Sequence, residues 1–125
     1  QEDGRSGTLP TALIAGLGEA ARIAASRMAA DHAHALMLRD ALLAGLSVPH
    51  RVNGSRDHRW PGNLNLSFPG VSVPLIQRLP GLAISAGSAC AAVTGRASHV
   101  LTALGLAEAE AKASLRLGFG RFTTL

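Results

Sequence analysis

The spacing of apolar residues changes near Pro49, and this change is the feature that most constrains the fold. Before it, from Leu9 to Leu46, apolar residues recur every three or four positions, which predicts one long helix or two helices joined by a bend. Pro49 ends this stretch, because proline cannot continue a helix. After it, short segments alternate apolar and polar residues, as strands do. The pattern therefore predicts a long helix followed by a small sheet.

Short elements fill the rest of the sequence. Thr8, which precedes Leu9 and Pro10, is a candidate N-cap for the long helix, and Gly105 is placed to end a later one. The expected order is strand, strand, helix, strand, loop, helix, turn or short helix, and strand, over residues 50–53, 64–68, 73–79, 82–85, 86–96, 97–104, 107–112 and 114–119. This order predicts an α+β fold in which helices pack on a small, mostly antiparallel sheet.

Composition and charge exclude several classes of function. With 125 residues, 47% hydrophobic and 3% aromatic, the chain can bury the core of one modest domain. Its arginines are scattered from Arg5 to Arg121 and few aromatics are present to stack on bases, so direct nucleic-acid binding is not expected despite a net charge of +4. No run of about 18 apolar residues could cross a membrane, and the histidines show no metal-ligand spacing. We expect a soluble, cytoplasmic domain without a metal.

Cys90 is the only cysteine, so it cannot form an internal disulfide. A lone cysteine indicates a reducing compartment or a reactive thiol. Residues 85–92, with the sequence SAGSACAA, carry side chains no larger than a thiol, and little in such a segment anchors it by packing. Residues 86–96 are therefore predicted to form a mobile loop that exposes a catalytic thiol. A buried cysteine that only fills space in a tight turn is the structural alternative.

Five segments of the sequence share their order with one enzyme family. They are GRSGTLP, NGSRDHRWPGNLNLSFPGV, SAGSACAA, ASHVLTALGL and SLRLGFGRFTT. This set resembles the C-terminal part of the cysteine desulfurases of the NifS/IscS type, which are class V aminotransferase-like enzymes of pyridoxal-phosphate fold type I. The resemblance covers nearly the whole chain. It implies that residues 1–125 are the small C-terminal domain of such an enzyme.

The resemblance implies a role for three residues. Family members use pyridoxal 5'-phosphate to convert L-cysteine to L-alanine, and a loop thiol, here Cys90, takes the sulfur as a persulfide and passes it to an acceptor. Acceptors are iron–sulfur scaffold proteins or tRNA-thiolation enzymes. The arginine that matches Arg116 holds the substrate carboxylate, a task that suits a planar guanidinium. The threonine that matches Thr8 reaches the cofactor phosphate of the neighbouring subunit, which implies a homodimer.

These residues also have structural interpretations. Arg116 lies on an alternating strand, on the opposite face from its leucine neighbours, where it would serve as a surface ion-pairing arginine. For Thr8, capping the helix is compatible with contacting the cofactor. Arg121 and Thr123 match the family's GRFT segment, and we interpret them as structural residues of a turn and a helix start.

The main departure from the family concerns the cofactor lysine. Family members bind the cofactor through a lysine that follows a histidine, whereas Lys112, the one lysine here, lies in EAEAKAS and matches no such motif. We therefore expect the large cofactor-binding domain to be absent from this chain, which looks like a fragment. Alone, the chain is expected neither to hold the cofactor covalently nor to desulfurate cysteine.

Two other functions remain open from the sequence. The first is a related class V enzyme, such as a selenocysteine lyase or an aminotransferase, although an aminotransferase needs no loop thiol. The second is a non-catalytic truncated fragment that acts through a partner, which the missing lysine favours.

Overall fold

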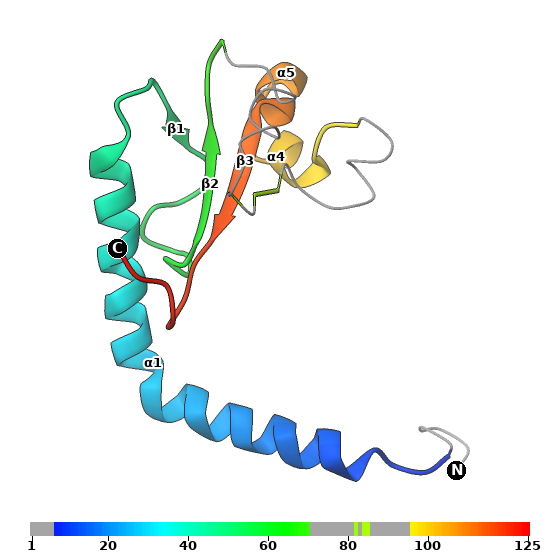
Figure 1. The fold of residues 1–125 in the computed structure, drawn as a ribbon. Coiled ribbons are helices and arrows are strands. Elements are labelled where there is room, and N and C mark those ends of the chain that lie inside the picture. Colours follow the sequence, from blue (N-terminus) through cyan, green and yellow to red (C-terminus); the bar gives the residue numbers. More distant parts are fainter. Residues whose placement is uncertain (1–6, 71–81, 83, 86–95) are drawn as a thin grey trace.

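The computed structural model describes residues 7–70, 82, 84–85 and 96–125. Within these ranges, one long helix and two short ones lie on either side of a three-stranded sheet (Figure 1). In chain order the described elements are α1 (Thr11–Gly45), β1 (Arg51–Val52), β2 (Asn63–Ser67), α4 (His99–Ala103), α5 (Glu108–Lys112) and β3 (Ser114–Gly118). The C-terminal part of α1 lies on one side of the sheet, and α4 and α5 lie on the other. The predicted α+β class is confirmed.

The sheet is antiparallel, with the strand order β1-β2-β3. In its register Asn65 lies opposite Arg116 and Leu66 lies opposite Leu115. The predicted strands over 50–53, 64–68 and 114–119 are confirmed: the first and last are slightly shorter than predicted, and the middle one begins and ends one residue earlier. Of the strand predicted over 82–85, the described residues show a single bridge, in which the Arg116 N–H donates to the Ser85 carbonyl over 2.6 Å. The helix predicted over 73–79 lies outside the described residues.

Each strand of this sheet separates apolar from polar side chains, because successive residues point to opposite faces. Leu64 and Leu66 are both 0% exposed and share a face with Leu115, the cross-strand neighbour of Leu66, on the side of α1. Asn65 and Arg116 occupy the other face, on the side of α4 and α5. The sheet therefore uses one face for packing and presents polar groups on the other.

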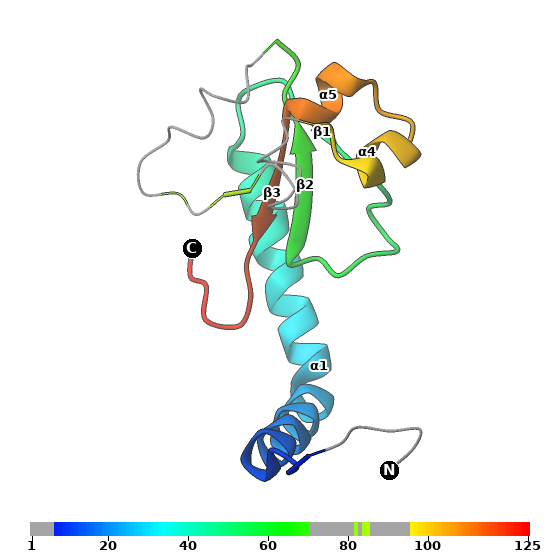
Figure 2. The same cartoon turned by 90° about the vertical axis from the view of Figure 1, so that its right-hand side faces the viewer.

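Helix α1 is one continuous helix, which is the first of the two predicted alternatives. It bends near its middle (Figure 1). The Ser26 hydroxyl donates to the Ile23 carbonyl over 2.9 Å, a type of bond that often accompanies helix bending. Ala35 and Leu38 are its buried residues. Its first half, residues 11–30, extends past the sheet (Figure 2) and contains no buried residue.

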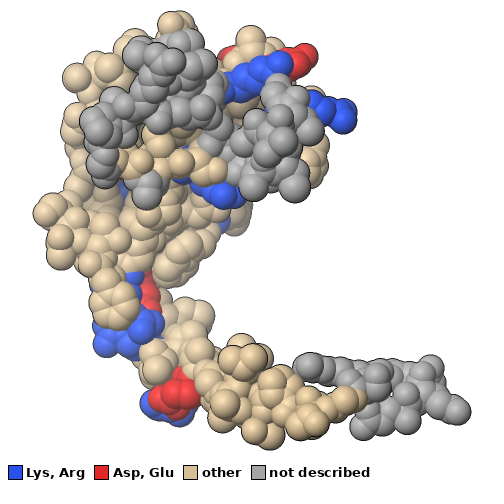
Figure 3. Space-filling model, turned by 45° about the vertical axis from the view of Figure 1, so that its right-hand side comes forward, with Lys and Arg blue, Asp and Glu red and all other residues tan. Residues whose placement is uncertain are grey.

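The first half of α1 therefore exposes the apolar stripe that the sequence predicts. Leu13 and Leu17 are 74% and 72% exposed, and Met28 is 67% exposed. Figure 3 shows few charged side chains along this part of the visible face. Among the described residues, no helix is both long enough and apolar enough to cross a membrane.

The start of α1 differs from the prediction that Thr8 caps it. Pro10 is the N-cap residue and makes no side-chain capping bond, while its carbonyl accepts from the Ile14 N–H over 3.0 Å. Because a residue before proline avoids the helical conformation, Leu9 stays outside the helix and the helix begins later than expected. Thr8 is thus two residues before the N-cap, too early to cap the first turn.

The end of α4 confirms the prediction for Gly105. This glycine has a φ of +86°, the Leu106 N–H donates to the Leu101 carbonyl over 3.1 Å, and the Gly105 N–H donates to the Thr102 carbonyl over 2.9 Å. The pair of bonds is a Schellman motif, whose left-handed position favours glycine. Leu101 and Leu106 then pack together with Ala111 of α5 in a small buried cluster.

The segment after β3 is tied to α1. Both carboxylate oxygens of Asp31 accept from Arg121 Nε over 3.0 Å, and a shorter contact joins Asp31 to Arg121 Nη2. The Thr123 N–H donates to the Gly120 carbonyl over 2.9 Å, which closes a turn, and the Thr123 carbonyl lies 2.9 Å from His34 Nε2. The structural role predicted for Arg121, in a turn, is confirmed. Thr123 closes that same turn, and the helix start predicted there is not seen in the described residues 123–125.

Candidate functional site

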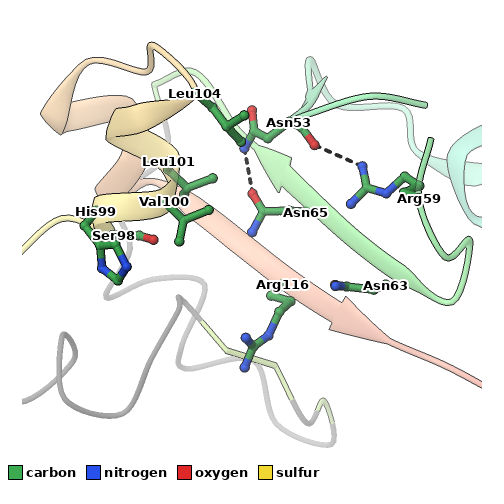
Figure 4. Close-up of a pocket in the computed structure, with 10 residues that line it drawn as sticks. All are labelled: Asn53, Arg59, Asn63, Asn65, Ser98, His99, Val100, Leu101, Leu104 and Arg116. Carbon is green, nitrogen blue, oxygen red and sulfur yellow. Dashed lines mark hydrogen bonds between the residues drawn. The ribbon is translucent and has the colours of Figure 1, made fainter. Parts of the chain in front are cut away.

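A pocket of about 290 Å³ lies between the polar face of the sheet and α4 (Figure 4). The sheet side contributes Asn63 and Asn65 from β2 and Arg116 from β3. Asn53 and Arg59, from the segment between β1 and β2, line the same space. The first turn of α4 closes the other side. The walls therefore combine two guanidinium groups with three amides, which favours an anionic ligand.

Arg116 is exposed in the middle of β3, directly opposite Asn65. Its backbone is held on both edges, by β2 and by the bridge to Ser85. The sequence prediction that Arg116 points away from its leucine neighbours is confirmed, because it lines the pocket while Leu115 is buried. Because the backbone of Arg116 is fixed in this way, the guanidinium reaches toward a ligand from a defined position.

Arg59 supplies the second cation. Its Nη1 donates to the Asn53 carbonyl over 2.9 Å, and its Nε is buried without a hydrogen-bond partner among the described residues. Burial lowers the pKa of Arg59, and the positive charge of Arg39 lowers it further. Arginine nevertheless stays protonated in proteins, so this wall of the pocket remains positive.

The sheet side of the pocket rests on a buried polar network centred on Asn53. The Asn53 side chain is 3% exposed and joins β2 to β3 through hydrogen bonds to Asn65 and Ser114. Ser67 and Ser114, which flank it, are 2% and 0% exposed. Because buried polar groups are costly without partners, such a network fixes the relative position of the strands.

Of the three residues that the resemblance singles out, the structure places one in this pocket. Arg116 lines it, whereas Thr8 is exposed just before α1, whose first half extends away from the sheet (Figure 1). Thr8 and Arg116 are therefore not brought together within one chain. Cys90 and the interpretation of residues 86–96 as its loop lie outside the described residues and stay predictions.

Sequence reasoning gave no role to Asn53, Asn65 or Arg59. Asn65 carried a usable signal, since it alternates with buried leucines on the strand predicted to pair near Arg116. Asn53 and Arg59 offered none, because their place in the pocket depends on the path of the segment between β1 and β2.

The one lysine of the chain lies away from this pocket. This residue, Lys112, is on α5 and pairs with Glu108 over 2.8 Å. The hydrogen bond from Lys112 lowers the pKa of Glu108, as expected for a surface pair. The described part of the chain also holds no group of three or more His, Cys, Asp or Glu residues that could bind a metal.

Comparison with known proteins assigns the family. The model of the aminotransferase class-V family matches residues 2–125. The chain belongs to the class V aminotransferase family. Its sequence and its fold are both similar to those of known proteins, and the predicted similarity to cysteine desulfurases of the NifS/IscS type is confirmed.

Curated relatives of this class V chain include two bacterial proteins named cysteine desulfurase IscS. The protein from Colwellia psychrerythraea is 51% identical over 123 residues, which make up 96% of this chain and 30% of the relative. The protein from Neisseria gonorrhoeae is 50% identical over the same share of each chain. The class V chain thus spans about 30% of the length of these relatives.

Solved structures share the fold. DndA from Streptomyces lividans superposes with a TM-score of 0.69 at 41% identity, covering 93% of this chain and 33% of DndA. SspA in complex with cysteine gives a TM-score of 0.65 at 29% identity, covering 96% of this chain and 33% of SspA. The α+β fold described above is therefore that of one part of larger proteins.

Proposed function

We propose that these residues are the small C-terminal domain of a cysteine desulfurase, which converts L-cysteine to L-alanine with pyridoxal 5'-phosphate. The observation that carries the proposal is Arg116 in a polar pocket of a chain that is 51% identical to a protein named cysteine desulfurase. A guanidinium among amides suits the carboxylate of an amino acid. The relative SspA, whose structure contains cysteine, supports the same substrate class.

In this proposal Cys90 is the nucleophile. Its thiolate attacks the sulfur of the substrate, and a sulfur–sulfur bond forms as the carbon–sulfur bond of the substrate breaks. The electron pair of the broken bond goes to the carbon, which takes up a proton and becomes the methyl group of alanine. The sulfur remains on Cys90 as a persulfide. An acceptor thiol then takes it, in iron–sulfur cluster assembly or tRNA thiolation.

Arg116 would hold the substrate carboxylate in the pocket, and Thr8 would contact the cofactor phosphate in the neighbouring subunit of a homodimer. The distance of α1's first half from the sheet supports the second assignment, because Thr8 does not serve the pocket of its own chain. We place the whole enzyme in the cytoplasm.

Apart from the contact of Thr8 with its phosphate, the cofactor would be bound mainly by parts of the enzyme other than these residues, and the lysine that holds it covalently would lie there. Lys112 is paired with Glu108 on the surface and is the one lysine available. The 125-residue chain by itself is therefore expected to be inactive. If it bound the cofactor covalently and released sulfide from cysteine, this part of the proposal would be wrong.

The test is Cys90→Ser in the full-length enzyme. We expect persulfide formation and sulfide release to be lost, because a hydroxyl cannot accept the sulfur, while the visible absorbance of the bound cofactor stays unchanged. Ser88→Ala is the matched control in the same segment and should retain both. Persulfide is measured by thiol alkylation and mass spectrometry. Retained sulfur transfer by Cys90→Ser would reject the proposed role.

Substrate turnover separates the related functions. A cysteine desulfurase converts L-cysteine through Cys90, whereas preferential turnover of L-selenocysteine would indicate a selenocysteine lyase. Transamination of L-alanine with no need for Cys90 would indicate an aminotransferase.

A further inference from the structure

A chain of hydrogen bonds across the polar face of the sheet has a defined direction. It starts at Ser114, whose hydroxyl donates to the Glu110 carbonyl over 2.8 Å. A carbonyl only accepts, so the single hydroxyl proton of Ser114 is committed to it. Ser114 Oγ can therefore act only as an acceptor toward Asn53, whose Nδ2 lies 3.1 Å away.

This commitment fixes the orientation of the Asn53 amide. Its Nδ2 donates to Ser114 and also, over 2.7 Å, to Oδ1 of Asn65, while its Oδ1 accepts from the Ser67 hydroxyl over 3.1 Å. A flipped amide would set its oxygen against the Ser114 oxygen and against Asn65 Oδ1, leaving buried groups unpaired at a site that is 3% exposed. The orientation of Asn53 in turn sets that of Asn65, with its oxygen toward Asn53.

The amide nitrogen of Asn65 consequently faces the pocket. Figure 4 shows it pointing away from Asn53, on the side of the pocket that His99 and Arg116 line. Asn65 is half-buried and directly opposite Arg116, a relation that places their Cβ atoms about 4.5–5.5 Å apart. No described residue accepts a hydrogen bond from this nitrogen. Its two N–H donors are thus presented beside the guanidinium.

We infer that Asn65 is a second recognition residue of the carboxylate subsite, and that Asn53 is the positioning residue that turns its N–H groups toward the ligand. A carboxylate only accepts hydrogen bonds, so a guanidinium and an adjacent amide N–H are complementary to it, whereas an amide oxygen would repel it. This inference rests on the proposed function, in which Arg116 binds the carboxylate of an amino acid. It adds a residue to which sequence reasoning gave no chemistry.

The test measures ligand binding by the full-length enzyme, with L-alanine, the product, and L-alaninamide, which lacks the carboxylate. Asn65→Ala is expected to weaken L-alanine binding about 10-fold, as for loss of a hydrogen bond to a charged group. Asn65→Asp is expected to weaken it further, because a carboxylate replaces the donor. Binding of L-alaninamide should change less than about 2-fold in Asn65→Ala, which shows that the variant is folded. In steady state, KM for L-cysteine should rise more than kcat falls.

Arg116→Gln separates the failure of this inference from failure of the proposed function. If Arg116→Gln weakens L-alanine binding and Asn65→Ala does not, the inference about Asn65 is overturned while the role of Arg116 stands. If Arg116→Gln leaves L-alanine binding unchanged, the proposed carboxylate site itself fails. Equal weakening of L-alanine and L-alaninamide by Asn65→Ala would show a merely structural role and would also overturn the inference.

Discussion

The two faces of the sheet are built from alternate residues of the same strands, yet they do different work. On the α1 side, Leu64, Leu66 and Leu115 are at most 5% exposed and do not line the pocket. On the α4 side, Asn65 and Arg116 line a pocket and rest on the buried amide of Asn53. The first face stabilises the sheet through burial, and the second holds polar groups in place for a ligand.

This difference shows how a small domain separates stability from recognition. A change on the apolar face should lower stability whether or not a ligand is bound, whereas a change on the polar face should first alter ligand binding. Asn53 belongs to both categories, since it is buried and also positions a pocket residue.

Leu64→Ala should give the largest loss. The side chain is 0% exposed, so its removal loses buried apolar surface and leaves a cavity, at a cost of about 2–5 kcal/mol. Native-state hydrogen exchange of the β2 and β3 amides in the full-length protein measures the loss. Asn65→Ala, the next position on the opposite face, is the comparison and should cost clearly less. Equal losses at the two positions would mean that both faces contribute alike to stability.

Asn53→Ala should have an intermediate effect. It leaves Ser67 and Ser114 without a partner that they now bond, which costs about 1–3 kcal/mol for buried polar groups. Asn63→Ala is the matched control, because Asn63 is exposed on the same face and its loss should change stability by less than about 0.5 kcal/mol. The same hydrogen-exchange measurement applies. An unaltered Asn53→Ala protein would show that the network does not hold the strands.

The ion pair between Asp31 and Arg121 should give the smallest effect and a distinctive pH dependence. The hydrogen bond from Arg121 lowers the pKa of Asp31. An aspartate in an unfolded chain has a pKa of about 3.9. As the pH falls, the unfolded chain therefore takes up this proton before the folded chain does. The contribution to stability is complete above about pH 5 and is lost as the pH falls through the folded pKa.

Urea midpoints measured from pH 6 to pH 3 on the wild type and on Asp31→Asn test this assignment. The two curves should converge as the pH falls, because the amide has no carboxyl to protonate. Asp40→Asn is the control, since Asp40 is exposed and pairs only with its neighbour Arg39 among the described residues. A difference between wild type and Asp31→Asn that stays constant with pH would contradict the assignment.

Local patterns were enough to predict most of the fold. Alternation located the strands, and Gly105 marked the end of α4 because its left-handed conformation favours glycine. The start of α1 was misplaced at Thr8, since the effect of Pro10 on the residue before it outweighed the preference of a hydroxyl for capping. The helix itself was predicted correctly from its apolar spacing, but periodicity cannot tell which part of a helix is covered.

The site was only partly predictable. Arg116 could be found from its motif and its place in an alternating strand, and both its strand and its face are confirmed. Asn53 could not be found in this way, because its role depends on hydrogen bonds to residues 12 and 61 positions away. Contacts between such distant residues follow from the register of the sheet, which the composition of a single segment does not determine.

Strand β3 is anchored close to both ends, by the bond from Asn53 to Ser114 and, just past the strand, by the pair of Arg121 with Asp31. Because side chains alternate, slippage of β3 by one residue would turn Arg116 toward α1 and bring a leucine into the pocket. The two anchors make such misalignment costly during folding. Ligand binding by this domain therefore also indicates that β3 is correctly aligned. A shift of β3 by an odd number of residues would remove Arg116 from the pocket side.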